Sequence, residues 1–337
     1  MNLYIKKLEK ELLKAGHTTV YINKCILYAE RLVFNRLPVI FDIEHFSMLT
    51  GVVTDELIEL QNGGASYKRV EIPKKNKNLR VLSIPDTKLK YLQRWILKNV
   101  LNNLSISKNA KGFKTGLSIV ENAKSHVDKE CVINIDISDF FDSINNRMIY
   151  KLFRYYGYTQ EISRLFMAIC TYEGSLPQGA PTSPYLANLV CKRLDYEINQ
   201  AIKNNNNINF TRYSDDITIS GGIDIYNKLK TITKIINQYG FEVNAKKTRI
   251  SYKHQRQKVT GIIVNEKLSV PRNFVRTLRQ EIHYCKKFGV GFHMKKKGIS
   301  NSNYKLHLYG KAYFIKMIDK KLGQKFLIDL SQINWEY

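Results

Sequence analysis

Two adjacent aspartates, Asp215 and Asp216, stand between two short runs that favour strands, and this pattern limits the possible folds more than any other feature. The residues on either side, 209–213 and 217–220, are mostly β-branched or aromatic, as in the two strands of a hairpin. Neighbouring carboxylates repel each other, so a fold that keeps such a pair at a hairpin tip usually supplies a cation. The alternative is a solvated turn, because Asp is a common turn residue.

A third carboxylate, Asp136, interrupts a short apolar run over residues 131–137. The run predicts a buried strand, and a buried carboxylate is costly unless it is paired or binds a metal. The simplest joint interpretation places Asp136 beside the 215–216 hairpin in one sheet. Three carboxylates would then hold two Mg²⁺ ions, which prefer oxygen ligands. Two such ions activate an attacking hydroxyl and stabilise a leaving phosphate oxygen.

The charge balance indicates a polyanionic partner. Among 337 residues, 54 are Lys or Arg and 29 are Asp or Glu, which gives a formal net charge of +25, and such an excess is typical of nucleic-acid-binding proteins. An anionic membrane surface is the competing partner, but no long apolar segment is present to span a bilayer. The five Cys are scattered, so we expect free thiols in a reducing cytoplasm and no zinc site.

Three motifs resemble motifs A, B and C of reverse transcriptases and occur in the same order. They are Asp136 with Phe140-Phe141, Leu176-Pro-Gln-Gly179, and Tyr213-Ser-Asp-Asp216. The third motif more often has Ala or Val at its second position, where this chain has Ser214. Two further stretches, Asn122-Ala-Lys-Ser-His126 and Val259-Thr-Gly261, are similar to signatures of the bacterial retron reverse transcriptases. The resemblance extends over roughly residues 60–265.

The resemblance implies roles for the acidic residues and for one lysine. Asp136 and Asp215 would hold the two metal ions, Mg²⁺ or Mn²⁺ as a substitute, with Asp216 assisting and the Ile137 carbonyl as a further ligand. Lys247 would protonate the pyrophosphate leaving group, a role that needs no large pKa shift. The neighbouring Lys246 remains an alternative.

The resemblance also implies contacts with the incoming nucleotide. Residues 67–72 and 79–84 predict a hairpin whose basic loop, with Lys74, Lys75, Lys77 and Arg80, suits a triphosphate. In the family, Arg80 matches an arginine that contacts the nucleotide, and Gln178 lies against it; which lysine joins them stays open.

Phe141 is five residues after Asp136, where the family places a steric gate. Its ring would clash with a ribose 2′-hydroxyl, the group that distinguishes RNA from DNA precursors. A core phenylalanine is the alternative, because Phe is often buried.

RNA contacts are expected at the two retron-like signatures. Asn122 and His126 are four residues apart and would share one face of a helix, although a single His is more often structural. Val259, Thr260 and Gly261 are the other candidates.

Helical periodicity and glycine-rich breaks predict the arrangement of the chain. We expect an N-terminal helical segment (1–60) with Thr54 capping its fourth helix, fingers (61–110), a palm that includes part of the fingers (111–264), and a helical thumb (265–337). Further helices are expected over 89–104, 186–198 and 225–236, and a hairpin over 258–270 with its turn at Asn265-Glu266. The fold class is α/β (α+β), a right-hand polymerase with an antiparallel-sheet palm.

The function that the resemblance implies is RNA-directed DNA synthesis by a retron enzyme. Such an enzyme copies its own structured noncoding RNA from deoxynucleoside triphosphates, starts from a 2′-hydroxyl of that RNA, and makes a branched RNA–DNA hybrid (msDNA). In the family these systems defend bacteria against phage, with a separate effector protein. The alternatives are a reverse transcriptase of group II intron or abortive-infection type, and a non-catalytic RNA-binding scaffold.

Overall fold

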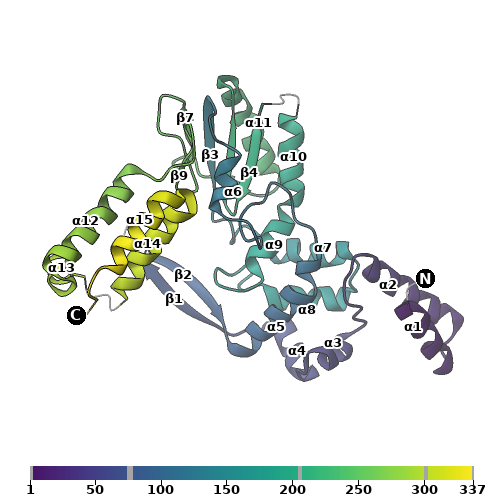
Figure 1. Cartoon of the computed structure of the whole chain (residues 1–337). Helices are drawn as coiled ribbons and strands as arrows, with labels where there is room; N and C mark the ends of the chain where they lie inside the picture. Colours follow the sequence, from purple (N-terminus) through teal and green to yellow (C-terminus); the bar gives the residue numbers. More distant parts are fainter. Residues whose placement is uncertain (1–2, 74–78, 204–206, 300–302, 336–337) are drawn as a thin grey trace. The chain divides into compact units, whose positions relative to one another are not determined.

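A computed structural model describes residues 3–73, 79–203, 207–299 and 303–335 (Figure 1). The chain divides into two compact units. The first contains Met1–Phe113, Ile137–Ile198 and Lys234–Glu242, and the second contains Lys114–Asp136, Asn199–Thr233 and Val243–Tyr337. The four-part division expected from the sequence stays a prediction.

The N-terminal segment is helical, as expected: α1 (Leu3–Lys14), α2 (Thr19–Phe34), α3 (Ile43–Thr50) and α4 (Thr54–Gln61). The side chain of Asp42 accepts the backbone N–H of His45 at the start of α3, and Gly51 ends this helix in the left-handed conformation, which glycine adopts without strain. The prediction for α4 was wrong in detail. Thr54 is its first helical residue, and Val53 precedes it without a side-chain cap.

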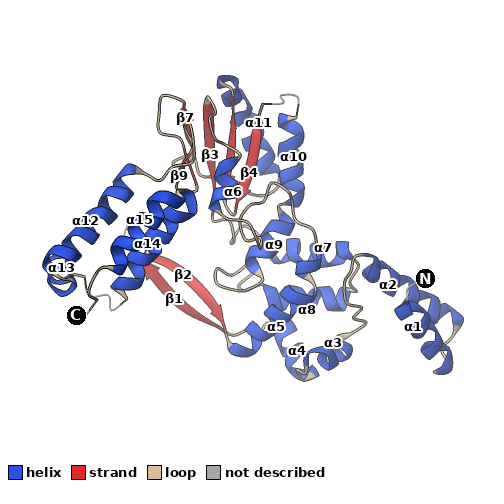
Figure 2. Cartoon of the chain, in the orientation of Figure 1, coloured by secondary structure: helices blue, strands red, loops and turns tan. Residues whose placement is uncertain are grey.

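The predicted basic hairpin is present as β1 (Tyr67–Pro73) and β2 (Leu79–Pro85), which pair antiparallel from Tyr67 opposite Pro85 to Pro73 opposite Leu79 (Figure 2). The three lysines of its loop lie outside the described residues. Helix α5 (Thr87–Asn99) follows and is capped by the side chain of Asp86. It is shorter than expected, because a 3₁₀ turn, η1 (Leu101–Asn103), replaces its last turn.

After β3 (Cys131–Ser138), the chain forms α7 (Asn146–Tyr156), α8 (Gln160–Cys170), α9 (Ser183–Val190) and α10 (Lys192–Ile202). The single helix expected over 186–198 is thus two helices that meet at Cys191. Helix α8 packs against α4, α5 and α7. At its centre, the Phe166 ring meets the rings of Phe46 and Phe153 edge to face, a favoured aromatic arrangement.

An antiparallel sheet carries the three aspartates Asp136, Asp215 and Asp216 at one end. Its strands are β3 (Cys131–Ser138), β4 (Asn209–Tyr213), β5 (Asp216–Gly221), β6 (Glu242–Val243) and β7 (Arg249–Tyr252). The order is β4-β5-β3-β6, and β7 also pairs with β3. Val132, Ile133 and Ile135 of β3 are buried, which confirms the buried strand predicted from the sequence.

The second unit also contains a short helix, α6 (Ile119–Lys124), and a small hairpin made of β8 (Lys258–Val259) and β9 (Ile262–Ile263). They share a small apolar core with β3. The β8–β9 turn is formed by Thr260 and Gly261, so the hairpin turns earlier than expected. The loop around Asn265-Glu266 makes a second turn, closed by paired backbone hydrogen bonds between Ile263 and Ser269 of 2.9 and 3.0 Å.

The helix expected over 225–236 begins as a 3₁₀ segment, η2 (Ile223–Lys228), and continues as α11 (Leu229–Gln238). The 3₁₀ start places Ile225 in the core. None of the helices in the described part of the chain is long and apolar enough to cross a membrane.

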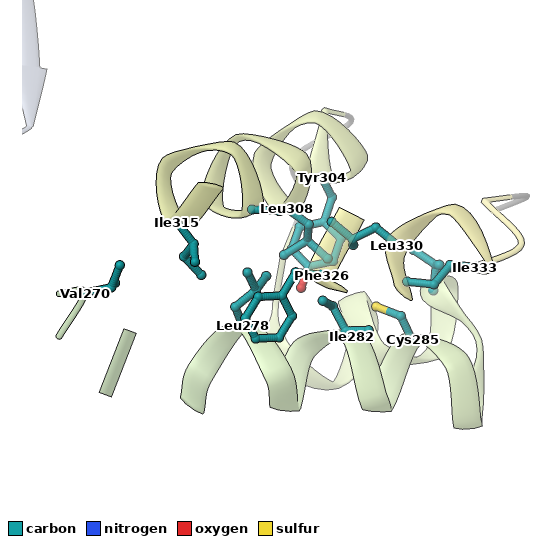
Figure 3. Close-up of a cluster of buried hydrophobic side chains, with 12 residues drawn as sticks. Val270, Leu278, Ile282, Cys285, Tyr304, Leu308, Ile315, Phe326, Leu330 and Ile333 are labelled. Carbon is teal, nitrogen blue, oxygen red and sulfur yellow. The ribbon is translucent and has the colours of Figure 1, made fainter. Parts of the chain in front are cut away.

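The described residues from Arg272 onwards form helices α12 (Arg272–Phe288), α13 (Val290–Lys297), α14 (Tyr304–Ile318) and α15 (Lys320–Ser331), which share one apolar core. Figure 3 shows buried side chains of α12, α14 and α15 pointing toward one another, among them Leu278, Leu308 and Phe326. Leu306, Tyr313 and Met317 belong to α14 and are exposed, whereas its buried residues include Leu308 and Ile315. Lys295–Lys297 belong to the last turn of α13 and not to a loop.

Candidate active site

A tight turn places the Asp215-Asp216 pair. Tyr213 at the end of β4 lies opposite Asp216 at the start of β5, so only Ser214 and Asp215 connect the strands. Ser214 has a φ of 60°, in the left-handed region that non-glycine residues occupy at a cost. The guanidinium of the buried Arg212 donates a hydrogen bond to the Ser214 carbonyl at 3.2 Å. The buried arginine thus helps to hold the strained turn.

Asp136 lies directly opposite Asp216 across the β3–β5 pair. Opposed residues of an antiparallel pair have Cβ atoms roughly 4.5–5.5 Å apart, so the three carboxylates share one end of the sheet, as predicted. Asp136 is 9% exposed. The Lys247 ammonium donates to its two carboxylate oxygens at 2.9 and 3.2 Å. The structure therefore brings Lys247, and not its neighbour Lys246, to the acidic site.

The site carries more negative charge than one lysine neutralises. Burial, together with the charges of Asp215 and Asp136, raises the pKa of Asp216 to about 6. Burial is also the main cause of the raised pKa of Asp215. The hydrogen bond to Asp136 raises the pKa of Lys247, so this side chain is protonated at neutral pH. Such a cluster favours the binding of a further cation.

The donor chemistry fits a hard divalent cation. Carboxylate oxygens are the ligands that Mg²⁺ and Mn²⁺ prefer, and Asp136, Asp215 and Asp216 supply them from adjacent strands. Among the described residues, no group of three or more Asp, Glu, His or Cys side chains is already gathered tightly enough to hold an ion. The cation that Asp136 contacts is Lys247. Ile137, the next residue of β3, is buried, and its carbonyl as a metal ligand stays a prediction.

A polar groove of about 460 Å³ adjoins Asp216. Its lining includes the cationic side chains Arg249, Arg256 and Lys258 and the small polar residues Asn134 and Thr218. Asp216, Thr260 and Gly261 also line it. A groove with three cations next to acidic catalytic candidates suits a phosphate backbone that leads to the site.

The two retron-like signatures meet beside this groove. The Asn122 amide donates to the Thr260 hydroxyl at 3.4 Å, and that hydroxyl donates to the Ile119 carbonyl at 3.3 Å. Thr260 and Gly261 both have positive φ, 44° and 95°, as in the two-residue turns that join hairpin strands. A β-branched residue is strained in this region, so these bonds help to hold the turn.

Asn122 and His126 have no exposed surface. Helix α6 ends at Lys124, so His126 follows it and does not share a helical face with Asn122. The two His126 ring nitrogens lie 2.7 Å from the hydroxyls of Ser220 and Thr211. Their burial does not support the direct RNA contact expected from the sequence. The contacts instead point to positioning of the Thr260 turn and of strands β4 and β5.

The nucleotide-binding candidates belong to the first unit. Arg80 is exposed on β2. Phe141 is half-buried, and its ring lies near those of Phe113 and Phe140, with centroids 6.5 and 5.4 Å apart. The Gln178 carbonyl accepts the backbone N–H of Ser83 on β2 at 2.8 Å.

The backbone at position 179, directly after Gln178, requires glycine. Its φ is +128°, and a Cβ at this position would lie 2.8 Å from the Ser83 carbonyl oxygen. The motif therefore holds β2 by a backbone contact that only glycine permits. Pro and Gly in this stretch favour a stiff, closely approached backbone, but the sequence alone does not identify Ser83 as the partner.

An antiparallel sheet with paired carboxylates, a lysine and a cationic groove suits a site that transfers nucleotides. The comparisons with known proteins identify the class. The family described as "Reverse transcriptase (RNA-dependent DNA polymerase)" matches residues 72–264, and the chain belongs to this family. Its members generally use divalent metal ions.

Retron enzymes are among the most similar relatives. The retron Ec86 reverse transcriptase of Escherichia coli is 33% identical over 312 residues, which cover 89% of this chain and 92% of the relative. The retron Mx162 reverse transcriptase of Myxococcus xanthus is 33% identical over 303 residues, covering 79% and 61%. Within its family the chain is thus a bacterial retron reverse transcriptase, an RNA-directed DNA polymerase, as the motifs predicted.

Solved structures of telomerase are also similar. The Candida albicans telomerase in complex with a fragment of telomeric RNA matches with a TM-score of 0.46 and 13% identity, over 86% of this chain and 62% of that chain. Apo telomerase from Candida tropicalis matches with a TM-score of 0.48 and 12% identity, over 80% and 58%. The fold class predicted from the sequence is confirmed by the family match and by the mixed helices and antiparallel sheet.

Proposed function

We propose that the enzyme copies its own structured noncoding RNA into DNA and starts from a 2′-hydroxyl within that RNA, so that the product is a branched RNA–DNA hybrid. The observation that carries this proposal is the contact between Asn122 and Thr260. It joins two retron-like signatures, 138 residues apart in the chain, at the edge of the cationic groove that also includes Asp216.

Asp136, Asp215 and Asp216 would hold two divalent ions, Mg²⁺ or Mn²⁺ in its place. When bound, these ions supply activation of the attacking hydroxyl and stabilisation of the leaving phosphate oxygen. Lys247 holds a proton at its Nζ beside Asp136, and we assign it the protonation of the pyrophosphate leaving group. Ile137 would add its carbonyl oxygen.

Residues of the first unit would bind the deoxynucleoside triphosphate. Arg80, with a lysine of the loop between β1 and β2, supplies positive charge to the triphosphate. Gln178 is held against β2 through its own backbone, which leaves its amide to contact the nucleotide. Phe141, half-buried among aromatic rings, would exclude the ribose 2′-hydroxyl.

The enzyme would act in the bacterial cytoplasm in anti-phage defence together with a separate effector protein. This part of the proposal rests on the resemblance of the motifs to the retron family. In this scheme the chain is divided into an N-terminal helical segment, fingers, palm and thumb.

The test compares two reactions of the same preparations. The nucleic acid that copurifies with the protein is sequenced first, which identifies the cognate RNA and its branch point. The variant Thr260→Ala, which removes the hydroxyl that Asn122 contacts, is then assayed for self-primed synthesis on that RNA and for extension of a generic annealed primer. We expect loss of the first reaction and retention of the second, because the carboxylates and the His126 contacts to β4 and β5 are unchanged. Equal loss of both would contradict a role in RNA-specific priming.

A further inference from the structure

The first unit carries a groove that shares no residue with the carboxylate site. Its volume is about 1620 Å³, and it is lined by the end of α2, by η1 and by helices α7, α9 and α10. Three contacts fix these walls to one another. The Arg31 guanidinium donates to the Tyr155 carbonyl at 3.1 Å, the Tyr185 hydroxyl to the Leu104 carbonyl at 2.7 Å, and the Lys192 ammonium to the Ser105 hydroxyl at 2.9 Å.

The charged side chains of the groove are all positive. Arg36, Lys151, Lys192 and Arg193 line it, and none of the described residues along its walls is Asp or Glu. Arg193 also contacts Glu197, one helical turn away, at 3.4 Å in an exposed pair, which solvent screens strongly. The groove therefore favours an anionic ligand.

Large aromatic rings also line the groove, with much of their surface in water. Phe34 is 88% exposed, Tyr155 is 75% exposed and Tyr196 is 55% exposed. Large exposed aromatic residues that gather in one groove mark an interaction surface. A groove that combines cations with exposed rings is the arrangement by which proteins hold single-stranded nucleic acid, because the phosphates meet the charges and the bases stack on the rings.

We propose that this groove binds a single-stranded segment of nucleic acid. A duplex has no free base faces to stack on Tyr155 and Tyr196, so the rings favour a single strand. The groove lacks the carboxylates with which a basic partner protein would pair, and its positive charge complements phosphates. The proposal does not depend on how DNA synthesis is primed.

The test measures binding of short labelled oligo(U) and oligo(dT) by fluorescence anisotropy as salt is varied. Tyr155→Ala with Tyr196→Ala should weaken binding on the order of tenfold per ring. Tyr155→Phe with Tyr196→Phe retains the rings and should bind like the wild type. The control Tyr226→Ala removes an exposed ring elsewhere, on η2, and should have no effect.

The charge contribution is tested separately. Arg36→Ala with Lys151→Ala should reduce the slope of log K against log salt by about 1.4, since each phosphate contact on a single strand contributes about 0.7. The control Lys98→Ala, an exposed lysine on α5, should leave the slope unchanged. A stronger effect with oligo(U) than with oligo(dT) identifies the RNA as the ligand, and the opposite order identifies the DNA product.

Photo-cross-linking with 4-thiouridine locates the contact on the wild-type enzyme. Cross-links on Tyr155, Tyr156 or Tyr196 are expected. Wild-type affinity in the double tyrosine-to-alanine variant and in Arg36→Ala with Lys151→Ala, with no cross-link in the groove, would overturn the proposal and leave the surface to a protein partner. In either case, extension of a saturating annealed primer should be unchanged, which separates this result from a failure of the catalytic assignment.

Discussion

Thr260 offers a sharp test of how the retron-like signatures are held together. The Thr260 hydroxyl joins the strained β8–β9 turn to two groups of α6: it accepts from the Asn122 amide and donates to the Ile119 carbonyl. We consider three substitutions. Thr260→Ser retains the hydroxyl, Thr260→Gly removes both the hydroxyl and the strain, and Thr260→Val removes the hydroxyl but keeps the β-branch.

The expected energies follow from the geometry. Each hydrogen bond at 3.3–3.4 Å contributes about 0.5–1 kcal/mol, and leaving the buried Asn122 amide without an acceptor costs about 1 kcal/mol more. Thr260→Val should therefore reduce the free energy of unfolding by about 2–3 kcal/mol. Thr260→Gly loses the same bonds but relieves about 1–2 kcal/mol of left-handed strain, so its net loss is about 1 kcal/mol. Thr260→Ser should lie within about 0.5 kcal/mol of the wild type.

The assay is urea-induced unfolding of the three variants, with self-primed synthesis measured on the same preparations. Thr277→Val is the matched control, because the exposed Thr277 hydroxyl donates to the Asn273 carbonyl within its own helix, α12, and its loss should cost little. Stability should follow the order Ser, Thr, Gly, Val, with the first two nearly equal. A valine variant as stable as the wild type would show that the hydroxyl contacts do not hold the turn, and the reasoning would fail.

Other substitutions probe the polymerase site. Phe141→Ala should raise the ratio of ribonucleotide to deoxyribonucleotide incorporation in competition assays, and an unchanged ratio would assign Phe141 to the core. Gly179→Ala should destabilise the protein by about 1–3 kcal/mol through strain and a clash with the backbone of β2, and more than Gly174→Ala, where a Cβ has space; equal losses would refute the close approach. Lys247→Ala should slow single-turnover incorporation by a factor of roughly 10²–10⁴, whereas Lys246→Ala should be close to wild type; similar rates for both would remove the proton-donor role.

The strands and their acidic residues could be predicted because their signal is local. A buried strand needs an apolar run, and Asp136 within it must face something that compensates its charge. That argument placed Asp136 beside Asp216 correctly. The basic hairpin of β1 and β2 was likewise marked by two strand-forming runs around a polar loop.

The errors concern contacts between distant residues. Asn122 and His126 are polar, and nothing in their sequence neighbourhood shows that both are buried, with His126 between hydroxyls of β4 and β5 and the Asn122 NH₂ against the Thr260 hydroxyl. A related limit applies to α14, where apolar residues lie on several faces, so periodicity alone does not show that Leu308 and Ile315 are the ones that face the core.

The most direct test of the account is RNA-templated primer extension by Asp215→Asn with Asp216→Asn. The double variant should fold and bind RNA like the wild type, because Asp215 lies in the turn, Asp216 begins β5, and Asn retains the shape of both side chains. In Mg²⁺ or Mn²⁺ it should make no DNA, whereas Glu71→Gln, a change of an exposed carboxylate on β1, should leave the rate unchanged. Normal DNA synthesis by the double variant would contradict the assignment of the active site.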